Sequence, residues 1–478
     1  MNTKKAAING GKWITIATVI GTVLQFGQMV VLARLLTPGD FGLVALSNLI
    51  LSFFQLFTNL GFSNSIIYKQ ESDRSVLSTL YLMNIVLGLL IFGLIQVATP
   101  AIVDFKNEPR LERVLHLSSY YFLIVYFGQI YLFLMEKELQ FRTIALIEIA
   151  GTLVGTLTTL VMAFSGYHEL SLVAGQLVTQ AVKTPLLILL GRSLFKPALR
   201  FAFNKVGEHL RFGIFNLGDG VLGYIQSNYD NLFIGFVLGN DMLGLYTLAY
   251  QLAIFPITKL NPIILQVAYP VLAKMQNDNE ELKRLYLKIL DILSYCNFPL
   301  LVGLFLTADS VVPLLYGPGW EGTVGLIQIF VFIGMMMSLN HPLFTLAFTK
   351  GKPNLLFYLN VVTLIVKIPL VYWLGRQYGV VGAAAAFLTT TLFNLIVNFG
   401  IVHYLIGPFM SVFLRNVARP VLFCLLMVGA VTAYKSLFGY VGVVNAVAEI
   451  TIGGAVYAAL TLAFKFSLTD LKKLRQAL

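Results

Sequence analysis

Residues 13–36 read WITIATVIGTVLQFGQMVVLARLL, and Arg34 is the one charged side chain in this run. A helix needs about 20 apolar residues to cross the hydrocarbon core of a bilayer, so the run is long enough to span a membrane. It follows Lys4 and Lys5 closely, as in a signal peptide, but no small-residue cleavage site comes after it. We therefore predict that it forms a retained first transmembrane helix.

Further apolar runs of spanning length follow along the whole chain, and glycine and proline mark the gaps between them, as in Thr37-Pro38-Gly39. This pattern predicts an all-α polytopic membrane protein with about 14 transmembrane helices. The predicted spans are residues 13–36, 41–67, 77–99, 114–135, 143–164, 169–191, 212–238, 243–270, 288–308, 322–347, 355–375, 380–406, 412–434 and 441–464.

The composition agrees with a membrane protein. Of the 478 residues, 58% are hydrophobic and 12% are charged, and the mean hydropathy is +0.81. Soluble globular proteins carry about 25% charged residues, so the charged side chains here are too few to cover a water-soluble surface. This excludes a soluble enzyme, a disordered protein and a receptor with only one or two spans.

The basic residues indicate how the spans are oriented, because cytoplasmic loops of membrane proteins are enriched in Lys and Arg. With the N-terminus in the cytoplasm, the cytoplasmic segments hold 24 of the 33 Lys and Arg residues, the opposite face holds six, and three lie in mid-span. This asymmetry predicts an even number of spans and two cytoplasmic termini, although it does not separate 14 spans from 12. The net charge of +11 is therefore a topology signal. The basic residues do not cluster as in a nucleic-acid-binding segment.

The chain also contains an internal repeat. A shift of 202 residues places identical residues of the first two spans on the seventh and eighth spans, namely Gly11, Val19, Gly21, Leu36, Gly42, Leu43, Leu46 and Phe53. Six spans separate the copies, so the repeat is parallel, with its axis along the membrane normal. We predict two six-helix lobes around a central cavity: residues 1–191 form the N-terminal lobe, 192–211 a cytoplasmic basic linker, 212–406 the C-terminal lobe, and 407–478 an extra helix pair with a cytoplasmic tail.

Polar side chains recur at helical spacing on several predicted spans, so they share one face of each helix. Stripes of this kind on helices of both lobes predict a hydrated cavity. Its predicted polar lining is Gln25, Gln28, Asn48, Gln55, Asn59, Gln176, Gln180, Asn216, Gln226, Asn360 and Thr363. The alternative is that each of these side chains only hydrogen-bonds a neighbouring helix.

Charged side chains also lie within the predicted spans, where a charge normally faces a cavity or a partner. We predict that Lys183, Lys259 and Lys367 contact an anionic substrate. Asp219 and Asp230 would hold or release these lysines, or carry a coupled proton or cation. Two alternatives remain: the lysines extend to the membrane interface, or they pair with the aspartates in a purely structural role.

Motifs for catalysis or for cofactor binding do not stand out. The five histidines are scattered, and Cys296 and Cys424 are not spaced for a metal site or a disulfide. The sequence contains no recognisable Gly-rich phosphate loop or catalytic triad. We therefore expect no catalytic residue, no metal and no cofactor.

Two segments carry a family resemblance. Residues 33–42, ARLLTPGDFG, resemble the first loop of polysaccharide exporters, as do the later residues 244–246, GLY, and 269–273, YPVLA. These exporters are the Wzx-type lipid-linked oligosaccharide flippases of the multidrug/oligosaccharidyl-lipid/polysaccharide (MOP) exporter superfamily. The chain looks most similar to the branch associated with colanic acid, and the resemblance in span number and two-lobe organisation covers nearly all of it.

The resemblance implies a flippase in the bacterial inner membrane. It would move a polyprenyl-pyrophosphate-linked oligosaccharide repeat unit to the periplasmic leaflet by alternating access, for exopolysaccharide, O-antigen or capsule synthesis. The partners it implies are this lipid-linked glycan, membrane lipids and a polysaccharide polymerase complex, and it implies no nucleic acid.

Two other classes of function compete with this interpretation. A cation-coupled multidrug exporter of the same superfamily would favour an acidic cavity, whereas the lysines in mid-span here outnumber the aspartates. A membrane polysaccharide polymerase or ligase would need a reaction site on a large external loop. The longest external connection predicted here runs only from about Thr99 to Arg113.

Overall fold

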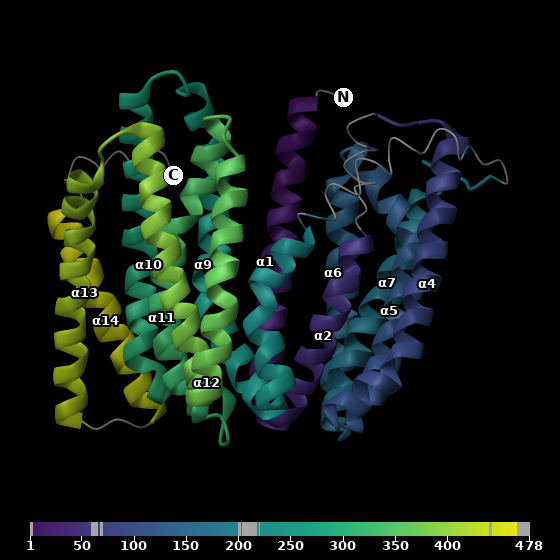
Figure 1. Cartoon of the computed structure of the whole chain (residues 1–478), viewed down its shortest axis with the longest axis horizontal. Helices are drawn as coiled ribbons and strands as arrows, with labels where there is room; N and C mark the ends of the chain where they lie inside the picture. The colour runs from purple at the N-terminus through teal and green to yellow at the C-terminus, as the bar shows by residue number, and fades with distance from the viewer. Residues whose placement is uncertain are drawn as a thin grey trace. The chain divides into compact units, whose positions relative to one another are not determined.

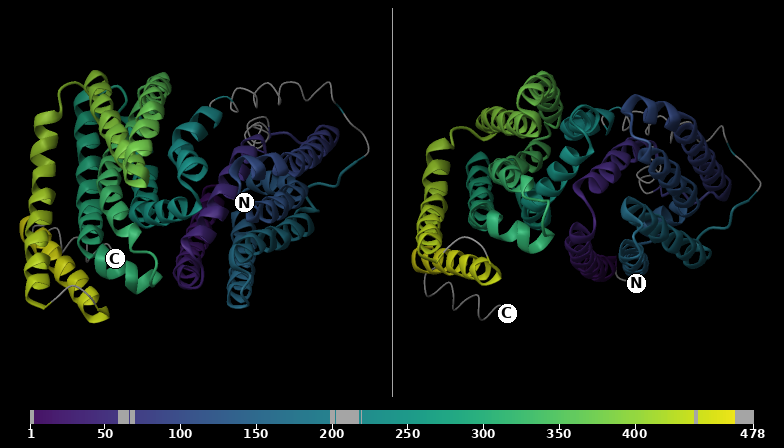
Figure 2. Two further views of the ribbon diagram at one scale, coloured as in Figure 1. Left: turned by 60° about the horizontal axis from the view of Figure 1, so that its bottom comes forward. Right: turned by 90° about the horizontal axis from the view of Figure 1, so that it is seen from below.

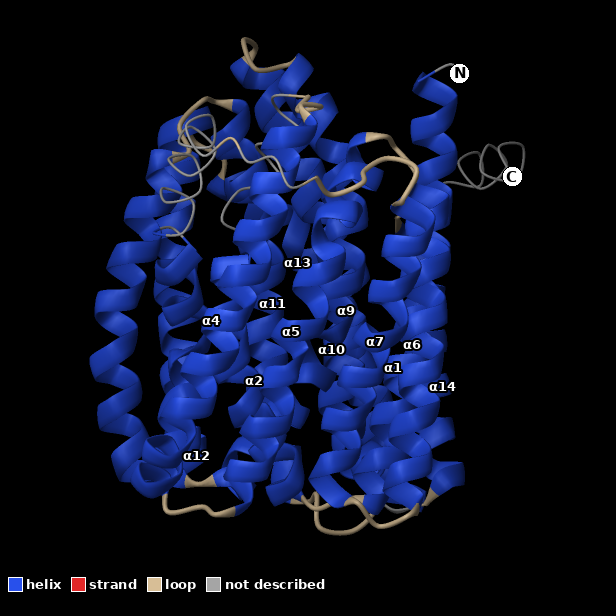
Figure 3. Ribbon diagram, turned by 90° about the vertical axis from the view of Figure 1, so that its right-hand side faces the viewer, coloured by secondary structure: helices blue, strands red, loops and turns tan. Residues whose placement is uncertain are grey.

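The computed structural model describes residues 3–58, 70–198, 220–438 and 442–465, together with residues 66, 202 and 218. This part of the chain is helical and contains no β-strand (Figure 3). A bilayer favours this outcome, because it offers no water to the backbone and each N–H and C=O must find its partner within the same helix. The predicted all-α fold is confirmed.

The described residues form long helices joined by short connections (Figure 1). Residues 220–233 are also helical and lead directly into a π-helical turn, η1 (Ile234–Leu238). The α-helices are α1 (Thr3–Leu35), α2 (Pro38–Thr58), α4 (Arg74–Lys106), α5 (Arg110–Lys137), α6 (Phe141–Phe164), α7 (His168–Gly191), α9 (Asn240–Lys274), α10 (Asn279–Tyr316), α11 (Gly322–Thr349), α12 (Asn354–Ile406), α13 (Met410–Phe438) and α14 (Val443–Phe464).

Twelve helices of the described part are long and apolar enough to cross a membrane. One of them, α12, has 53 residues and covers two predicted spans, 355–375 and 380–406. The two spans meet at Gly379, whose φ of 60° and ψ of −142° interrupt the helix. The helical residues 220–238 correspond to the seventh predicted span. The structure therefore agrees with the predicted number of about 14 spans.

Some helix ends lie well outside the predicted spans. Helix α10 begins at Asn279 instead of near residue 288, because the side chain of Asp278 caps it and accepts hydrogen bonds from the Glu280 and Glu281 N–H groups at 3.1 Å each. Helix α13 continues past residue 434 to Phe438. Its last turn contains Lys435, one of the six basic residues that the charge count places on the opposite face.

The chain divides into two compact units, Met1–Gly244 and Leu245–Leu478. In the first unit, α6 packs between α1 and α7, and α5 packs against α2, α4 and α7. In the second unit, α11 packs between α10 and α12, and the pair α13–α14 packs against α10 (Figure 2). Large apolar side chains are exposed on the outer helices, such as Leu90 and Val97 of α4. An apolar outer surface of this kind faces lipid in a membrane protein.

A close backbone crossing in the first unit reflects the internal repeat. A Cβ atom on Gly42 of α2 would collide with the carbonyl oxygen of Asn240, and one on Gly244 would collide with that of Pro38. The shift of 202 residues relates Gly42 to Gly244 and Pro38 to Asn240, so the two contacts are copies of each other. Only glycine permits this approach, which explains why the repeat keeps glycine at both positions.

The predicted division into two lobes, a linker and an extra helix pair stays a prediction. Most of the predicted linker, residues 192–211, lies outside the described residues. Residues 192–198, which are described, leave the end of α7 through a turn.

Candidate functional site

The first unit contains a polar cavity of about 440 Å³, which is lined by side chains of α1, α2, α5, α6 and α7. Helical periodicity places the polar faces of these helices toward the same space, because residues three and four positions apart lie on one side of a helix. Seven of the predicted site residues line this cavity: Gln25, Gln28, Asn48, Gln55, Gln176, Gln180 and Lys183. The structure thus brings together the predicted polar stripes of α1, α2 and α7.

An ion pair lies at the cavity wall. The Lys183 Nζ of α7 lies 2.5 Å from the Glu148 Oε2 of α6, and the exposed fractions of the two side chains are 14% and 45%. The sequence analysis considered Asp219 and Asp230 as partners for the lysines, whereas Lys183 pairs with Glu148. Among the described lining residues, these two carry the formal charges. The cavity is therefore close to neutral while the pair is intact.

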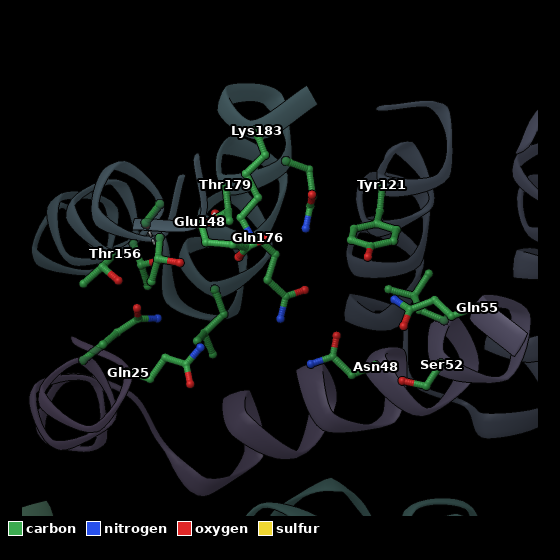
Figure 4. Close-up of a pocket in the computed structure, with 18 residues that line it drawn as sticks. Gln25, Asn48, Ser52, Gln55, Tyr121, Glu148, Thr156, Gln176, Thr179 and Lys183 are labelled. Carbon is green, nitrogen blue, oxygen red and sulfur yellow. Dashed lines mark hydrogen bonds and ion pairs between the residues drawn. The ribbon is translucent and has the colours of Figure 1, made fainter. Parts of the chain in front are cut away.

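Amide and hydroxyl groups surround this pair (Figure 4). The amides of Asn48 and Gln55 on α2 and of Gln176 on α7 point toward the space between the helices (Figure 4). The Tyr121 ring of α5 lies on the opposite side of this space from Glu148 (Figure 4). Uncharged donors and acceptors at this density suit a ligand that is rich in hydroxyl groups.

Sequence reasoning missed a polar stripe on α6. Glu148, Thr152, Thr156 and Thr159 line the cavity at spacings of four, four and three residues. The periodicity rule that identified the other stripes applies here as well, but Glu148 lies near the end of the predicted span 143–164 and was not counted among the mid-span charges. Ser52 and Tyr121 were also missed. Ser52 lies between Asn48 and Gln55 on the same face of α2 and could have been found by the same rule, whereas Tyr121 is an isolated polar ring on α5.

Small residues hold α6 and α7 close together. A Cβ atom on Gly155 would collide with the hydroxyl of Thr179, and one on Gly175 would collide with that of Thr159. These threonine hydroxyls donate to the carbonyl oxygens of the glycines in their own helices, at 2.7 Å for Thr179 to Gly175 and 3.0 Å for Thr159 to Gly155. Close packing of small residues is a common way to join helices in a bilayer. It sets the distance between α6 and α7 and so allows Glu148 to reach Lys183.

The remaining predicted residues of the first unit do not join this cavity or cannot be placed. Asp230 is buried, with 1% of its surface exposed, and Gln226 is half-buried. Neither lines the cavity. Asn59, Asn216 and Asp219 lie outside the described residues.

The other two predicted lysines belong to the second unit. Lys367 of α12 is buried, and its Nζ lies 4.6 Å from the centre of the Phe387 ring. Lys259 of α9 is half-buried, and its Nζ lies 5.8 Å from the centre of the Phe255 ring. An ammonium over an aromatic face is stabilised by the ring quadrupole, by about 0.5–2 kcal/mol. Both lysines therefore have local aromatic contacts within their own helices.

Asn360 and Thr363 lie on the same helix as Lys367. Asn360 is exposed. Thr363 is buried and accepts a hydrogen bond at 3.0 Å from the Asn394 side chain of the same long helix. Thr363 also donates to the Leu359 carbonyl oxygen at 2.7 Å. A search of the described residues finds no group of His, Cys, Asp and Glu that could hold a metal ion.

Comparisons with known proteins agree with the predicted family. The sequence model of a family described as "Polysaccharide biosynthesis protein" matches residues 31–325. The lipopolysaccharide biosynthesis protein WzxC of Escherichia coli K12 is 33% identical over 399 residues, which are 84% of this chain and 81% of that protein.

Solved structures show the same fold. The lipid II flippase MurJ in its inward closed conformation matches 94% of this chain and 98% of its own, with a TM-score of 0.78 and 14% identity. An inward-facing MATE family multidrug transporter of the MOP superfamily matches 84% of this chain and 99% of its own, with a TM-score of 0.65 and 13% identity. At such low identity these likenesses concern the fold alone. The chain is a multi-pass membrane protein with the fold of MOP-superfamily transporters, and it belongs to the polysaccharide biosynthesis protein family.

Proposed function

We propose that the chain is a flippase that moves a polyprenyl-pyrophosphate-linked oligosaccharide repeat unit across the bacterial inner membrane by alternating access. It is a transport protein and catalyses no reaction. Its family membership and the name of its E. coli relative, a lipopolysaccharide biosynthesis protein, support a role in glycan synthesis. The MurJ-like fold supports translocation of a lipid-linked substrate.

The polar cavity around Lys183 is the observation that carries this proposal. The head group of such a substrate combines a charged pyrophosphate with many sugar hydroxyls, and neither crosses hydrocarbon unaided. The cavity lies among membrane-spanning helices and offers an ammonium group together with several amides and hydroxyls. An ammonium binds phosphate oxygens by charge-assisted hydrogen bonds, which are shorter and stronger than neutral ones. The amides and hydroxyls can form hydrogen bonds with the hydroxyl groups of the sugar.

Glu148 acts as the resting counter-ion of Lys183 in this proposal. A pyrophosphate that enters the cavity replaces Glu148 beside the ammonium, so Lys183 stays paired in both states. This exchange avoids the cost of an unpaired charge in a medium of low dielectric constant. Because 45% of the Glu148 side chain is exposed, its carboxylate can be solvated by water in the cavity after it leaves Lys183.

The proposal extends to residues of the second unit and to residues outside the described part of the chain. Lys259 and Lys367 would contact the pyrophosphate at other stages of transport, and Asp219 and Asp230 would pair with the lysines or bind a coupled ion. Both termini would be cytoplasmic. The transported unit would serve exopolysaccharide, O-antigen or capsule synthesis, beside a polymerase complex that uses the product.

Glu148 is also the feature that favours the second candidate, a cation-coupled multidrug exporter. A cationic drug would pair with Glu148 and displace Lys183, the reverse of the exchange proposed above. The two candidates predict opposite sensitivities. Flippase activity depends on the positive charge of Lys183, whereas drug export depends on the negative charge of Glu148.

Reconstitution tests the proposed function directly. The purified chain is placed in liposomes that contain a polyprenyl-pyrophosphate-linked oligosaccharide, and a glycosidase that cannot cross the membrane is added outside, with and without a proton or sodium gradient. We expect the enzyme to digest nearly all of the glycan with the wild-type chain, and only the outer-leaflet share with Lys183→Gln. Digestion limited to the outer leaflet with the wild-type chain under every gradient would contradict the proposal.

A further inference from the structure

A second charged cluster lies in the second unit, where α13 and α14 pack against α10 (Figure 2). The Lys435 Nζ of α13 contacts both carboxylate oxygens of Asp309 on α10, at 2.7 and 2.9 Å. The carboxyl group of Glu449 on α14 is a second, longer ion-pair contact of this ammonium, with Oε2 at 3.6 Å from Nζ. The cluster therefore joins three helices by one ammonium and two carboxyl groups.

Glu449 is the deeply buried member of this cluster. Its side chain has an exposed fraction of 0%, compared with 8% for Lys435 and 40% for Asp309. Its Oε1 accepts a hydrogen bond from the Ser310 hydroxyl at 3.3 Å, whereas its Oε2 is buried and has no hydrogen-bond partner. A buried carboxylate oxygen without a donor is costly, and the cost is greatest when the group is ionised.

The charges of the cluster do not balance. The groups that face Glu449 from α10 and α13 are Asp309, Ser310 and Lys435, so one positive charge meets two potential negative charges. Lys435 also donates to the Leu306 carbonyl oxygen at 2.5 Å, so its two shortest contacts to acceptors other than Glu449 are to Leu306 and Asp309. With both carboxyl groups ionised, a buried site among membrane helices would carry an excess negative charge. A proton on Glu449 removes this excess.

A second ion pair between α10 and the end of α14 shows the balanced alternative. Lys465 Nζ lies 2.6 Å from Asp291 Oδ2, and the two side chains have similar exposed fractions of 24% and 23%. One ammonium here meets one carboxylate, and both remain partly solvated. These helices thus carry one balanced pair and one unbalanced cluster. Of the two, only the cluster has a buried carboxylate oxygen without a hydrogen bond, Glu449 Oε2.

We propose that Glu449 is a proton-binding site at the junction between the C-terminal helix pair and α10. The proposed proton is held by the carboxyl group of Glu449, and the partly exposed Asp309 offers the route by which it exchanges with water. Loss of the proton would place a second carboxylate in competition for Lys435 and so weaken the contact of α13 with α10. This inference rests on the second unit alone and does not depend on the proposed function.

Infrared difference spectroscopy on the purified full-length protein tests the site, because a protonated carboxyl group has a C=O stretch that a carboxylate lacks. At neutral pH the wild-type protein should show a carboxylic acid band that disappears in Glu449→Gln. Asp291→Asn is the matched control and should keep the band, since it removes the carboxylate of the balanced pair between α10 and the end of α14. An unchanged spectrum in Glu449→Gln would overturn the proposal. Loss of the band in Asp309→Asn but not in Glu449→Gln would also overturn it, by placing the proton on Asp309.

Protein yield and melting temperature give an independent readout. Gln resembles a neutral carboxylic acid in size and polarity, so Glu449→Gln should retain the wild-type yield and melting temperature. Asp309→Asn should lower both, because it removes the carboxylate that pairs with Lys435. If Glu449→Gln is as unstable as Asp309→Asn, then Glu449 is an ionised partner of Lys435 and the proposal is wrong. A sodium-dependent rise in the wild-type melting temperature that Glu449→Gln abolishes would likewise contradict it, because the ligand would then be a metal cation.

Discussion

Lys183 Nζ lies 2.5 Å from Glu148 Oε2, and the two residues belong to adjacent helices although 35 positions separate them in the chain. The pair sits at the wall of a cavity whose other described lining residues are uncharged. Its position explains how a membrane protein can keep an ammonium group ready for an anionic ligand without a large cost in the empty state. The charge stays paired until another anion replaces Glu148.

Water access distinguishes a hydrated cavity from a packed helix interface. Replacing Cys296 and Cys424 with alanine removes both native thiols, and Gln176→Cys then reports on the cavity. A membrane-impermeant thiol reagent should label Gln176→Cys, because a thiol reacts as the thiolate and needs an aqueous environment.

Leu153→Cys is the matched control for this experiment. Leu153 lies on α6, and 43% of its surface is exposed on the apolar exterior, so its thiol would face lipid and react slowly. Equal labelling of Leu153→Cys and Gln176→Cys would mean that the polar stripe of α7 only packs against protein.

The crossing of α2 and α9 predicts a strong effect of one methyl group. Gly42→Ala should destabilise the protein by about 1–3 kcal/mol, which is the usual cost of overpacking a rigid contact, because the new Cβ atom collides with the Asn240 carbonyl oxygen. The measurement is the melting temperature in detergent. Gly27→Ala is the control, since a Cβ atom there meets nothing within 4 Å. A melting temperature for Gly42→Ala as high as that of Gly27→Ala would refute the close crossing.

The orientation of the helices in the membrane can be read with reporter fusions. A reporter inserted after Asn107, between α4 and α5, should be active outside the cytoplasm, and one inserted after Asn277, between α9 and α10, should be active inside. The reason is that basic residues concentrate on the side of the membrane that holds the α9–α10 connection, and such residues are enriched on the cytoplasmic side. A cytoplasmic signal at Asn107 would invert the proposed topology and with it the direction of transport.

The fold could be predicted almost completely from the sequence, because the length of an apolar run is set by the thickness of the bilayer. The positions of the helix ends could not be predicted. Helix α10 starts at Asn279 and passes through Glu280, Glu281, Lys283 and Arg284 before it becomes apolar. A hydropathy profile detects only the part of a helix that lies in hydrocarbon. It therefore does not identify a charged first turn that lies outside the hydrocarbon. The same holds for α13, whose last turn extends past the predicted span and contains Lys435.

The cavity could be predicted in part. The amides of α1, α2 and α7 repeat at helical spacing, and their common location follows from that periodicity. The partner of Lys183 could not be found in this way, because it depends on the axial register between α6 and α7. Gly155 and Gly175 fix that register through contacts with Thr179 and Thr159. Such a pairwise fit is a property of two helices together and has no signature in either sequence alone.

Polymer export by Lys183 variants tests the central claim most directly. The variants are expressed in cells that lack the chromosomal copy, and the amount of protein in the membrane is measured beside the amount of exported polymer. Lys183→Arg should retain export, because arginine keeps the charge and binds phosphate. Lys183→Gln should lower export about 10- to 100-fold at normal abundance, as expected for the loss of a hydrogen bond to a charged group worth about 1.5–3 kcal/mol. Adding Glu148→Gln should not restore it. Normal export by Lys183→Gln, or recovery of both abundance and export in the double variant, would contradict a direct role of Lys183 in holding an anionic head group.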